Sequence, residues 1–241
     1  MGVIYAEPEM KKLPYKILIA AVILSTAVSG TAFADVTARY GELQSVIDAI
    51  NDPDPLMRLA QLEEILKKGN ATEVQLAIRT AFSLDDANVR SLALRVHFAG
   101  FRTFVVTAAL PDGVKTVLAG SDKQAAKETG ASDLLRFFER TGYQFSFQSE
   151  YPGSDALEFA VKFLNNERPN VESTGSGNIR GGMITVTTPV TFENSPKACS
   201  FEFTQYQGFT LKGFGSCNID DGFLFPVTLH LFDNDKPPLG N

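Results

Sequence analysis

The chain contains 2 histidines, His97 and His230, and they are the first candidates for acid–base or metal chemistry. A metal pair within one element would need a second ligand at i+2, i+3 or i+4, and neither histidine has one. His97 precedes Phe98 in a helical pattern, and His230 lies between Leu229 and Leu231 in a strand pattern. We therefore expect both imidazoles to be structural, and we predict no metal site, no cofactor and no catalytic residue.

Acidic side chains offer two further kinds of chemistry. Paired carboxylates can hydrolyse glycosidic bonds and need no fixed sequence spacing. Four residues stay open as candidates for such a hydrolase, and they are Glu150, Asp155, Glu158 and Glu202. A second group, of the kind that calcium prefers, consists of Asp220, Asp221, Asp233 and Asp235. The strand expected between its two halves would place them at opposite rims, so we expect a turn and a solvated tail instead.

Two glycine-rich segments share only their composition with known motifs. Residues 175–182 miss the dinucleotide-binding spacing G-x-G-x-x-G and lack a following Lys-Ser/Thr, so we expect a hairpin or a loop there. Residues 213–217 lack the G-x-S-x-G spacing of a nucleophile elbow. A Ser-His-Asp set assembled from distant positions stays open, with His97 or His230 as its base.

The 2 cysteines, Cys199 and Cys217, predict one structural disulfide in an oxidising compartment. The C-x-x-C spacing of a redox-active pair is absent. Free or metal-binding thiols are the alternative.

A hairpin that joins the two cysteines would have a defined register. Its turn would centre on Gly208, with Phe203 opposite Gly213 and Phe201 opposite Gly215. Each ring would then cover backbone that the facing glycine leaves bare. The register, the turn glycine and the disulfide therefore agree with one another.

Residues 1–34 have the pattern of an export signal. Three lysines precede an uncharged, mostly apolar run at 17–28, and a small-x-small motif ends at Ala34. The run is shorter than the roughly 20 residues that a transmembrane helix needs. We expect translation to start at Met10 and cleavage to leave Asp35 as the first mature residue, without stable membrane insertion afterwards. An uncleaved anchor and a chance apolar segment are the alternatives.

Composition narrows the class of protein. The formal net charge is −6, and removal of the signal would make it more negative, which argues against nucleic acid and anionic lipid as partners. The apolar fraction of 44% and the 19 phenylalanines provide material for a core. The tryptophan count is 0, which weakens a sugar-stacking function without excluding it, because Phe and Tyr can substitute.

The apolar spacing from residue 35 to about residue 102 is helical. We predict four helices, the last three opened by Asp54, Thr72 and Asp86 as N-caps. Gly69 is expected to close the second.

Two of these helices share a pattern, because residues 54–62 align with residues 86–94 through a common Asp, Arg and Leu. Asp-Pro-x-x-Arg followed by an Ala/Leu face is similar to HEAT-type helical repeats, whose paired helices stack into a solenoid. The resemblance covers residues 44–100. A small antiparallel helical bundle is nevertheless the favoured interpretation and HEAT-like stacking the alternative, and in both cases the Asp and Arg are expected to cap helices and bridge neighbours.

Residues 101–131 are ambiguous. Residues 103–110 could end a helix or form a strand, and residues 114–118 could return as a short strand after a turn. A short helix is expected at 121–128. A further helix is expected to be capped by Ser132 and to stop at Gly142.

From Tyr143 onward the period changes to two, and turn clusters separate the apolar runs. About seven short strands at this spacing indicate an antiparallel sandwich or barrel. Strands are expected at 183–188 and 190–193, and residues 175–178 are expected to form a turn.

The sequence thus predicts an α+β protein with a signal at 1–34, a mainly helical domain at 35–142 and a mainly β domain at 143–241. We expect a periplasmic or secreted protein without catalytic activity that binds a protein or glycan partner. An envelope-polymer or glycan hydrolase with paired carboxylates is one alternative, and a structural envelope component is another.

Overall fold

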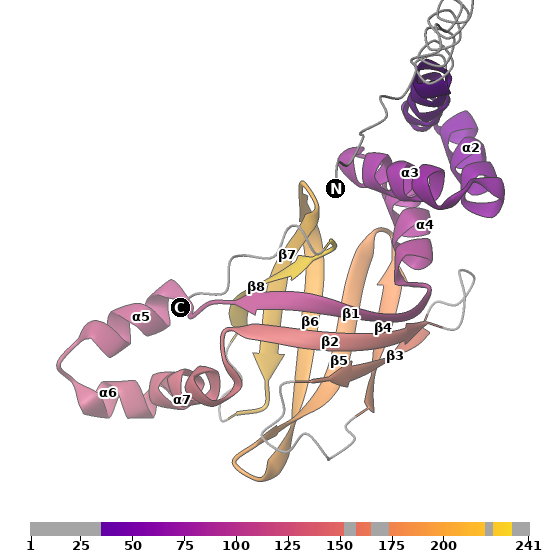
Figure 1. Ribbon diagram of the computed structural model, residues 1–241. Helices are drawn as coiled ribbons and strands as arrows, with labels where there is room; N and C mark the ends of the chain where they lie inside the picture. Colours follow the sequence, from indigo (N-terminus) through magenta and orange to yellow (C-terminus); the bar gives the residue numbers. More distant parts are fainter. Residues whose placement is uncertain (1–34, 152–157, 165–173, 220–223, 233–241) are drawn as a thin grey trace, which may run out of the picture. The chain divides into compact units, whose positions relative to one another are not determined.

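In the computed structural model, eight strands form a closed antiparallel barrel in which each strand pairs with its sequence neighbours and β8 pairs back with β1 (Figure 1). The structure describes residues 35–151, 158–164, 174–219 and 224–232. The strands are β1 (Gly100–Ala108), β2 (Gln144–Tyr151), β3 (Glu158–Phe163), β4 (Thr174–Arg180), β5 (Met183–Phe192), β6 (Ser195–Gln207), β7 (Thr210–Cys217) and β8 (Leu224–His230). The helices are α2 (Pro55–Lys68), α3 (Ala71–Ser83), α4 (Ala87–Phe98), α5 (Asp112–Ala119), α6 (Lys123–Glu128) and α7 (Ala131–Thr141). The α+β class is confirmed, with a barrel rather than a sandwich.

The chain divides into two compact units, residues 1–45 and residues 46–241. The described part of the first unit, residues 35–45, is helical. The second unit begins with helical residues 46–50 and contains all the labelled helices and strands. Among the described residues, no helix is both long enough and apolar enough to cross a membrane.

Side-chain caps start the helices that precede the barrel. Asp54 accepts hydrogen bonds from the first backbone amides of α2, and Asp86 does the same for α4, as predicted. The N-cap of α3 is Asn70, which forms a capping box with Glu73, so the expectation for Thr72 was wrong. Asn70 is the N-cap because its side-chain oxygen accepts hydrogen bonds from the backbone amides of Thr72 and Glu73. The Glu73 carboxylate in turn accepts a hydrogen bond from the backbone amide of Asn70.

Residues 100–142 combine a strand with a helical excursion. The strand alternative holds for β1, which is part of the barrel although it precedes residue 143. The short strand expected at 114–118 is wrong, because these residues lie in α5, where Val114 is buried. The helix α6 is confirmed and Gly142 closes α7 as expected. Ser132 lies inside α7, whose N-cap is the left-handed Gly130.

Phenylalanines fill the barrel where glycines leave room. A Cβ added at Gly177 would lie 2.2 Å from the ring of Phe159, and one at Gly215 would lie 2.5 Å from the ring of Phe225. Both glycines are therefore required by close approach of a ring to the backbone. The inward phenylalanines are Phe104, Phe145, Phe147, Phe159, Phe163, Phe201, Phe203 and Phe225, and all are at most 5% exposed.

The hairpin of β6 and β7 has the predicted register. Phe201 lies opposite Gly215 and Phe203 opposite Gly213, and Gly208 occupies the turn with a positive φ of 58°. Beyond Phe203 a register shift places Leu211 opposite Tyr206 rather than Gln205, so the predicted register holds from Cys199 to Phe203 only. Such a bulge inserts one extra residue and leaves the inner face of β7 unchanged.

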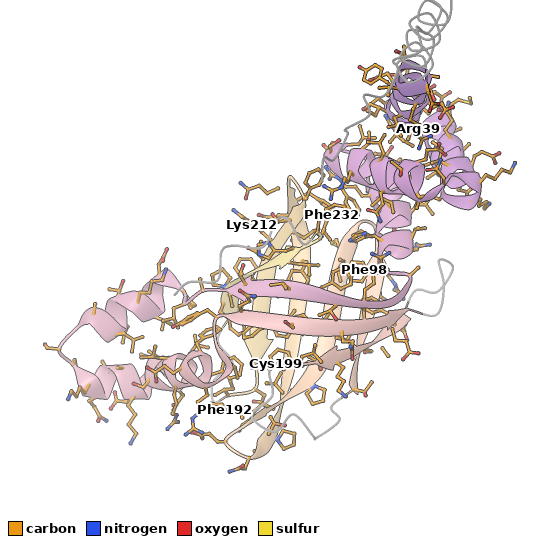
Figure 2. The ribbon with its side chains drawn as sticks, in the orientation of Figure 1. Arg39, Phe98, Phe192, Cys199, Lys212 and Phe232 are labelled. Carbon is orange, nitrogen blue, oxygen red and sulfur yellow. A yellow bond between two sulfur atoms is a disulfide. The ribbon has the colours of Figure 1, made fainter. Side chains whose placement is uncertain are left out.

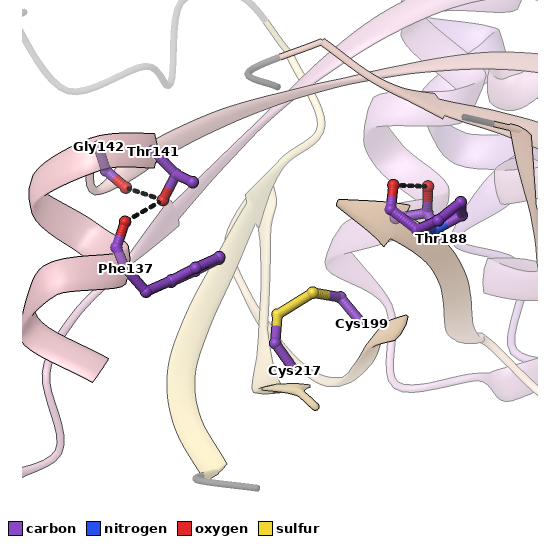
Figure 3. Close-up of a disulfide and its surroundings, with 7 residues drawn as sticks. Phe137, Thr141, Gly142, Thr188, Cys199 and Cys217 are labelled. Atoms are coloured by element: carbon purple, nitrogen blue, oxygen red, sulfur yellow. Dashed lines mark hydrogen bonds between the residues drawn. A yellow bond between two sulfur atoms is a disulfide. The ribbon is translucent and has the colours of Figure 1, made fainter. Parts of the chain in front are cut away.

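The disulfide between Cys199 and Cys217 is confirmed (Figure 3). The two residues pair directly across β6 and β7, with a Cα–Cα distance of 4.0 Å. Both are almost completely buried, and no free cysteine is present in the described chain.

Two details of β4 and β5 differ from the sequence prediction. Residues 175–178 are strand rather than turn, and the hairpin turn is Gly181–Gly182, where both φ angles are positive. Residues 183–192 form one strand that includes Pro189. The β4 ladder ends opposite Thr187, so the missing N–H of Pro189 interrupts no β4–β5 pairing.

Each end of the barrel is covered by a different helix. At the α4 end, Phe98 stacks on Phe104 with a centroid distance of 4.0 Å and lies 5.6 Å from Phe159. At the α7 end, the ring centroids of Phe138 and Phe225 lie 5.1 Å apart, and those of Phe137 and Phe192 lie 5.5 Å apart. Figure 2 labels Phe98 near α4 and Phe192 near α7. The core is therefore continuous from the helices through the barrel interior.

Candidate functional site

The two histidines, which are 133 positions apart in sequence, line one pocket of about 190 Å³ at the α4 end. His97 comes from the last turn of α4, and His230 is the last residue of β8. The pocket is lined by Gln75, His97, Arg102, Thr103, Phe104, Val105, His230, Leu231 and Phe232. We call it the histidine pocket. Its walls come from α3, α4, β1 and the residues around the end of β8.

His97 ties α4 to the barrel. Its Nε2 lies 2.6 Å from the carbonyl oxygen of Leu231. Because a carbonyl can only accept, Nε2 carries the hydrogen and Nδ1 carries the lone pair in the neutral ring. The ring also lies 4.8 Å from that of Phe232 and 5.8 Å from that of Phe104. This packing explains why a histidine inside a helical pattern is buried.

The His97 imidazole is neutral at pH 7. Burial lowers its pKa from 6.5 to about 4, and the positive charges of Arg102 and Arg79 add to the effect. The hydrogen bond to Leu231 acts in the opposite direction, but it is the smaller influence. Nδ1 is buried and has no hydrogen-bond partner in the described structure.

His230 bridges the seam where the barrel closes. Its Nε2 lies 3.0 Å from Oγ1 of Thr107 on β1, and the donor in this pair depends on the tautomer. Its Nδ1 is also buried without a partner among the described residues. Both histidines therefore have the structural contacts expected from the sequence, but each also has one unsatisfied ring nitrogen.

Arginines supply the charge around the histidine pocket. Arg102 is half-buried, and no carboxylate in the described part of the chain pairs with it. Arg79 places its guanidinium 4.0 Å from the ring centroid of Phe232, one of the lining residues. The described lining contains no acidic residue, and no described group of three or more His, Cys, Asp or Glu side chains could hold a metal ion. The pocket is therefore suited to a polar or anionic guest.

The candidate carboxylates lie elsewhere. Glu150 on β2 and Glu158 on β3 are both exposed, and they are diagonal neighbours because Glu150 pairs with Ala160. Glu202 is exposed on β6, separated from β3 by two strands. Asp155 lies outside the described residues. The structure thus brings two of the four together on the outer surface and places neither at the histidine pocket.

The other sequence candidates have ordinary structural roles or lie outside the described chain. Asp220, Asp221, Asp233 and Asp235 are outside the described residues. Residues 213–217 form β7, where Ser216 pairs with Ser200 and Leu224, so no strand-to-helix elbow exists there. Residues 175–182 form β4 and its turn, as the hairpin alternative predicted.

The Asp and Arg that residues 54–62 and 86–94 share have structural roles: the aspartates cap helices, and the arginines bridge neighbouring elements. Nη2 of Arg58 lies 2.8 Å from Oδ2 of Asp86, so the arginine of the first segment pairs with the cap of the second. Arg90, at the equivalent position, lies over the ring of Tyr206 at 4.3 Å, and the Tyr206 hydroxyl donates to the carbonyl of Gly182. These residues hold the helices together and hold α4 against the barrel.

The outer wall of the barrel carries an exposed apolar group, which we call the Phe214 patch. Phe214 on β7 is 56% exposed, and Leu224 on β8 is 65% exposed. Phe214 pairs with Pro226, and Leu224 is its diagonal neighbour opposite Ser216. On the other side Phe214 pairs with Glu202 of β6. An aromatic and two aliphatic side chains thus lie together within a polar surface.

Sequence analysis missed both features. The histidines meet only because α4 is docked beside the β1–β8 seam, and no local spacing contains that information. A signal was available for Phe214, because the period-two pattern of β7 places it on the outer face, opposite to the buried residues of that strand.

These features define the class as a closed eight-stranded antiparallel barrel, stapled by one disulfide and preceded by capped helices. Comparison with the models of known protein families, with curated proteins and with solved structures finds no match for this chain.

Proposed function

We propose that the protein is exported to the periplasm or the extracellular medium and acts there as a non-enzymatic binding protein for another protein. The signal pattern of residues 1–34 supports export, and the buried disulfide is compatible with an oxidising compartment.

The Phe214 patch is the observation that carries this proposal. Exposed aromatic side chains with a polar rim are typical of the centre of a protein interface, where they supply most of the binding energy. Phe214 has Glu202 beside it and Lys212 two residues away on the same strand, both exposed. We favour a protein over a glycan because the patch presents one aromatic ring beside two aliphatic side chains rather than several sugar-stacking rings.

A photo-crosslinking residue at position 214 tests the proposal in exporting cells. We expect a discrete protein adduct at position 214 that disappears when Leu224→Ser is added, because the partner would contact both side chains. The matched control carries the crosslinker at Thr174, an exposed residue three strands away on β4. Absence of an adduct at 214, or the same adduct at 174, would contradict the proposal.

The alternatives predict other outcomes. Release of reducing ends from an envelope polymer, lost in Glu150→Gln and retained in Glu202→Gln, would establish the hydrolase instead. Binding to a glycan array that requires Phe214 would replace the protein partner with a glycan. Retention in the insoluble envelope fraction after salt and detergent, unaffected by Phe214→Ser, would favour a structural component.

We also infer that α2 to α4 form a short HEAT-like pair rather than an unrelated bundle. The Arg58–Asp86 bridge supports this, since it joins the arginine of one segment to the N-cap of the similar segment that follows. A designed third copy of residues 54–85, inserted between α3 and α4, tests the inference. We expect the extended protein to fold cooperatively with additional helix, and aggregation of the insertion variant would contradict it.

A further inference from the structure

The histidine pocket is half open to solvent and carries a positive charge that no described carboxylate compensates. Its volume of about 190 Å³ is smaller than the roughly 300–1,000 Å³ typical of sites for drug-sized ligands. A guest must therefore be a small molecule of a few heavy atoms. The site lies at the α4 end, apart from the Phe214 patch on the outer wall.

Arg102 decides the sign of the guest's charge. Partly buried guanidinium groups normally pair with carboxylate or phosphate, because a desolvated charge without a counter-charge is costly. In the described structure the arginine pairs with no carboxylate, although Arg58 and Arg90 of the neighbouring helices each have one. Arg79 adds a second positive charge close enough to influence His97.

Neutral polar groups complete the lining. Gln75 on α3 can donate a hydrogen bond to an oxyanion, whereas the exposed side chain of Thr103 lies on the opposite face of β1 from Arg102. His97 contributes no charge at neutral pH, and its donor is already committed to Leu231. The pocket thus offers a bidentate donor from one guanidinium, flanked by an amide.

We propose that the histidine pocket binds a small oxyanion, a carboxylate or a phosphate, through the guanidinium of Arg102 with Gln75 as an additional donor. This site is separate from the partner surface proposed above, and neither depends on the other. A planar carboxylate or a phosphate face matches the two parallel N–H groups of arginine.

Titration of the mature protein with acetate and with inorganic phosphate tests this, followed by the amide and arginine Nε–H signals in NMR spectra. We expect saturable shifts at Arg102 and Gln75 with a Kd in the range of about 0.1–10 mM for such small ligands. Arg102→Gln should weaken binding at least tenfold. The charge-matched control Arg180→Gln, on the exposed end of β4, should change it less than twofold.

The outcomes separate the sources of the ligand. Saturation by acetate alone assigns a carboxylate, and saturation by phosphate alone assigns a phosphate. Shifts that follow ionic strength equally with chloride, or that Arg180→Gln reduces as much as Arg102→Gln, would overturn the proposal. If Arg102→Gln fails to fold, Arg102→Lys keeps the charge without the bidentate geometry and should retain weaker binding.

Discussion

The two ends of the barrel are closed by helices, but with different chemistry. At the α7 end, Phe137 and Phe138 insert among barrel phenylalanines, and the disulfide braces the strands nearby (Figure 3). At the α4 end, Phe98 packs in the same way, but a pocket lined by His97 and Arg102 lies there, and the Arg79 guanidinium lies over the ring of Phe232. The packing at the α7 end is that of an apolar core. At the α4 end, by contrast, the Nδ1 atoms of His97 and His230 are buried without a hydrogen-bond partner among the described residues.

Removing a ring from the α7 end should have the largest effect. Phe138 is 1% exposed and contacts several rings, so Phe138→Ala should lower the free energy of unfolding by about 3–5 kcal/mol. Urea denaturation followed by circular dichroism measures this. Leu56→Ala, at a residue that is 78% exposed, is the control and should change it by less than about 0.5 kcal/mol. A loss below about 1 kcal/mol for Phe138→Ala would mean that α7 is not part of the core.

The disulfide should come next. Replacing Cys199 and Cys217 together by Ala should cost about 3 kcal/mol in the chain-entropy model, given a separation of 18 residues. For a chain of this size that corresponds to a fall in Tm of roughly 10 °C. Calorimetry measures the shift, and crosslinking at position 214 should persist below the new Tm. Two free thiols in the unfolded, unreduced wild type would contradict the bridge.

The α4 end should make stability depend on pH. His97 has its pKa lowered from 6.5 to about 4, so between these values the unfolded chain binds a proton that the folded chain does not. The free energy of unfolding should therefore fall by up to roughly 3 kcal/mol as the pH decreases from 6.5 to 4, and this group should add nothing further below that. Asp86 also has a lowered pKa, but it acts below its ordinary value of 3.8.

Urea titrations at several pH values measure this dependence, and NMR of the imidazole reports its charge. The ring of His97 should remain neutral at pH 5. In His97→Gln, whose amide can still donate to Leu231, the fall in stability over this pH range should be much smaller. A ring that titrates near pH 6.5 would show that the α4 end is open to water.

The smallest effect should come from a matched pair of arginines. Arg79 lies 4.0 Å from the ring centroid of Phe232 at the α4 end, and Arg140 lies 6.0 Å from that of Phe192 at the α7 end. Arg79→Gln should cost about 1 kcal/mol, and Arg140→Gln about half as much, because the cation–π attraction weakens with distance. Chemical denaturation of the two variants compares them directly. Equal losses would remove this distinction between the ends.

Local patterns predicted much of the fold. Alternation along β6 and β7 and the positions of Cys199 and Cys217 determined a register that the structure confirms. Asp54 and Asp86 acted as caps because capping depends only on the next few residues. The α5 segment was expected to be a strand because short β-branched runs suit either state, and packing of Val114 decides between them.

The candidate sites depended on contacts that sequence spacing does not encode. Each histidine was expected to be structural, and the hydrogen bonds of His97 to Leu231 and of His230 to Thr107 agree with that. Their shared pocket arises because α4 and the β1–β8 seam are neighbours in space only. The diagonal pair Glu150 and Glu158 likewise needed the β2–β3 register, since a one-residue slip would place one of them inside the barrel.

The seam between β1 and β8 has a consequence for how the protein folds. All other pairings join strands that follow one another in the chain, and β4–β5, β5–β6 and β6–β7 are hairpins with two-residue turns. The seam joins Val105 to His230, so it requires closure of a loop that contains nearly the whole barrel. Loop-closure entropy makes such a contact slow to form, and the β1–β8 edges stay unpaired until it does. The histidine pocket is therefore complete only when β1 and β8 have paired, so an intact pocket indicates a closed barrel.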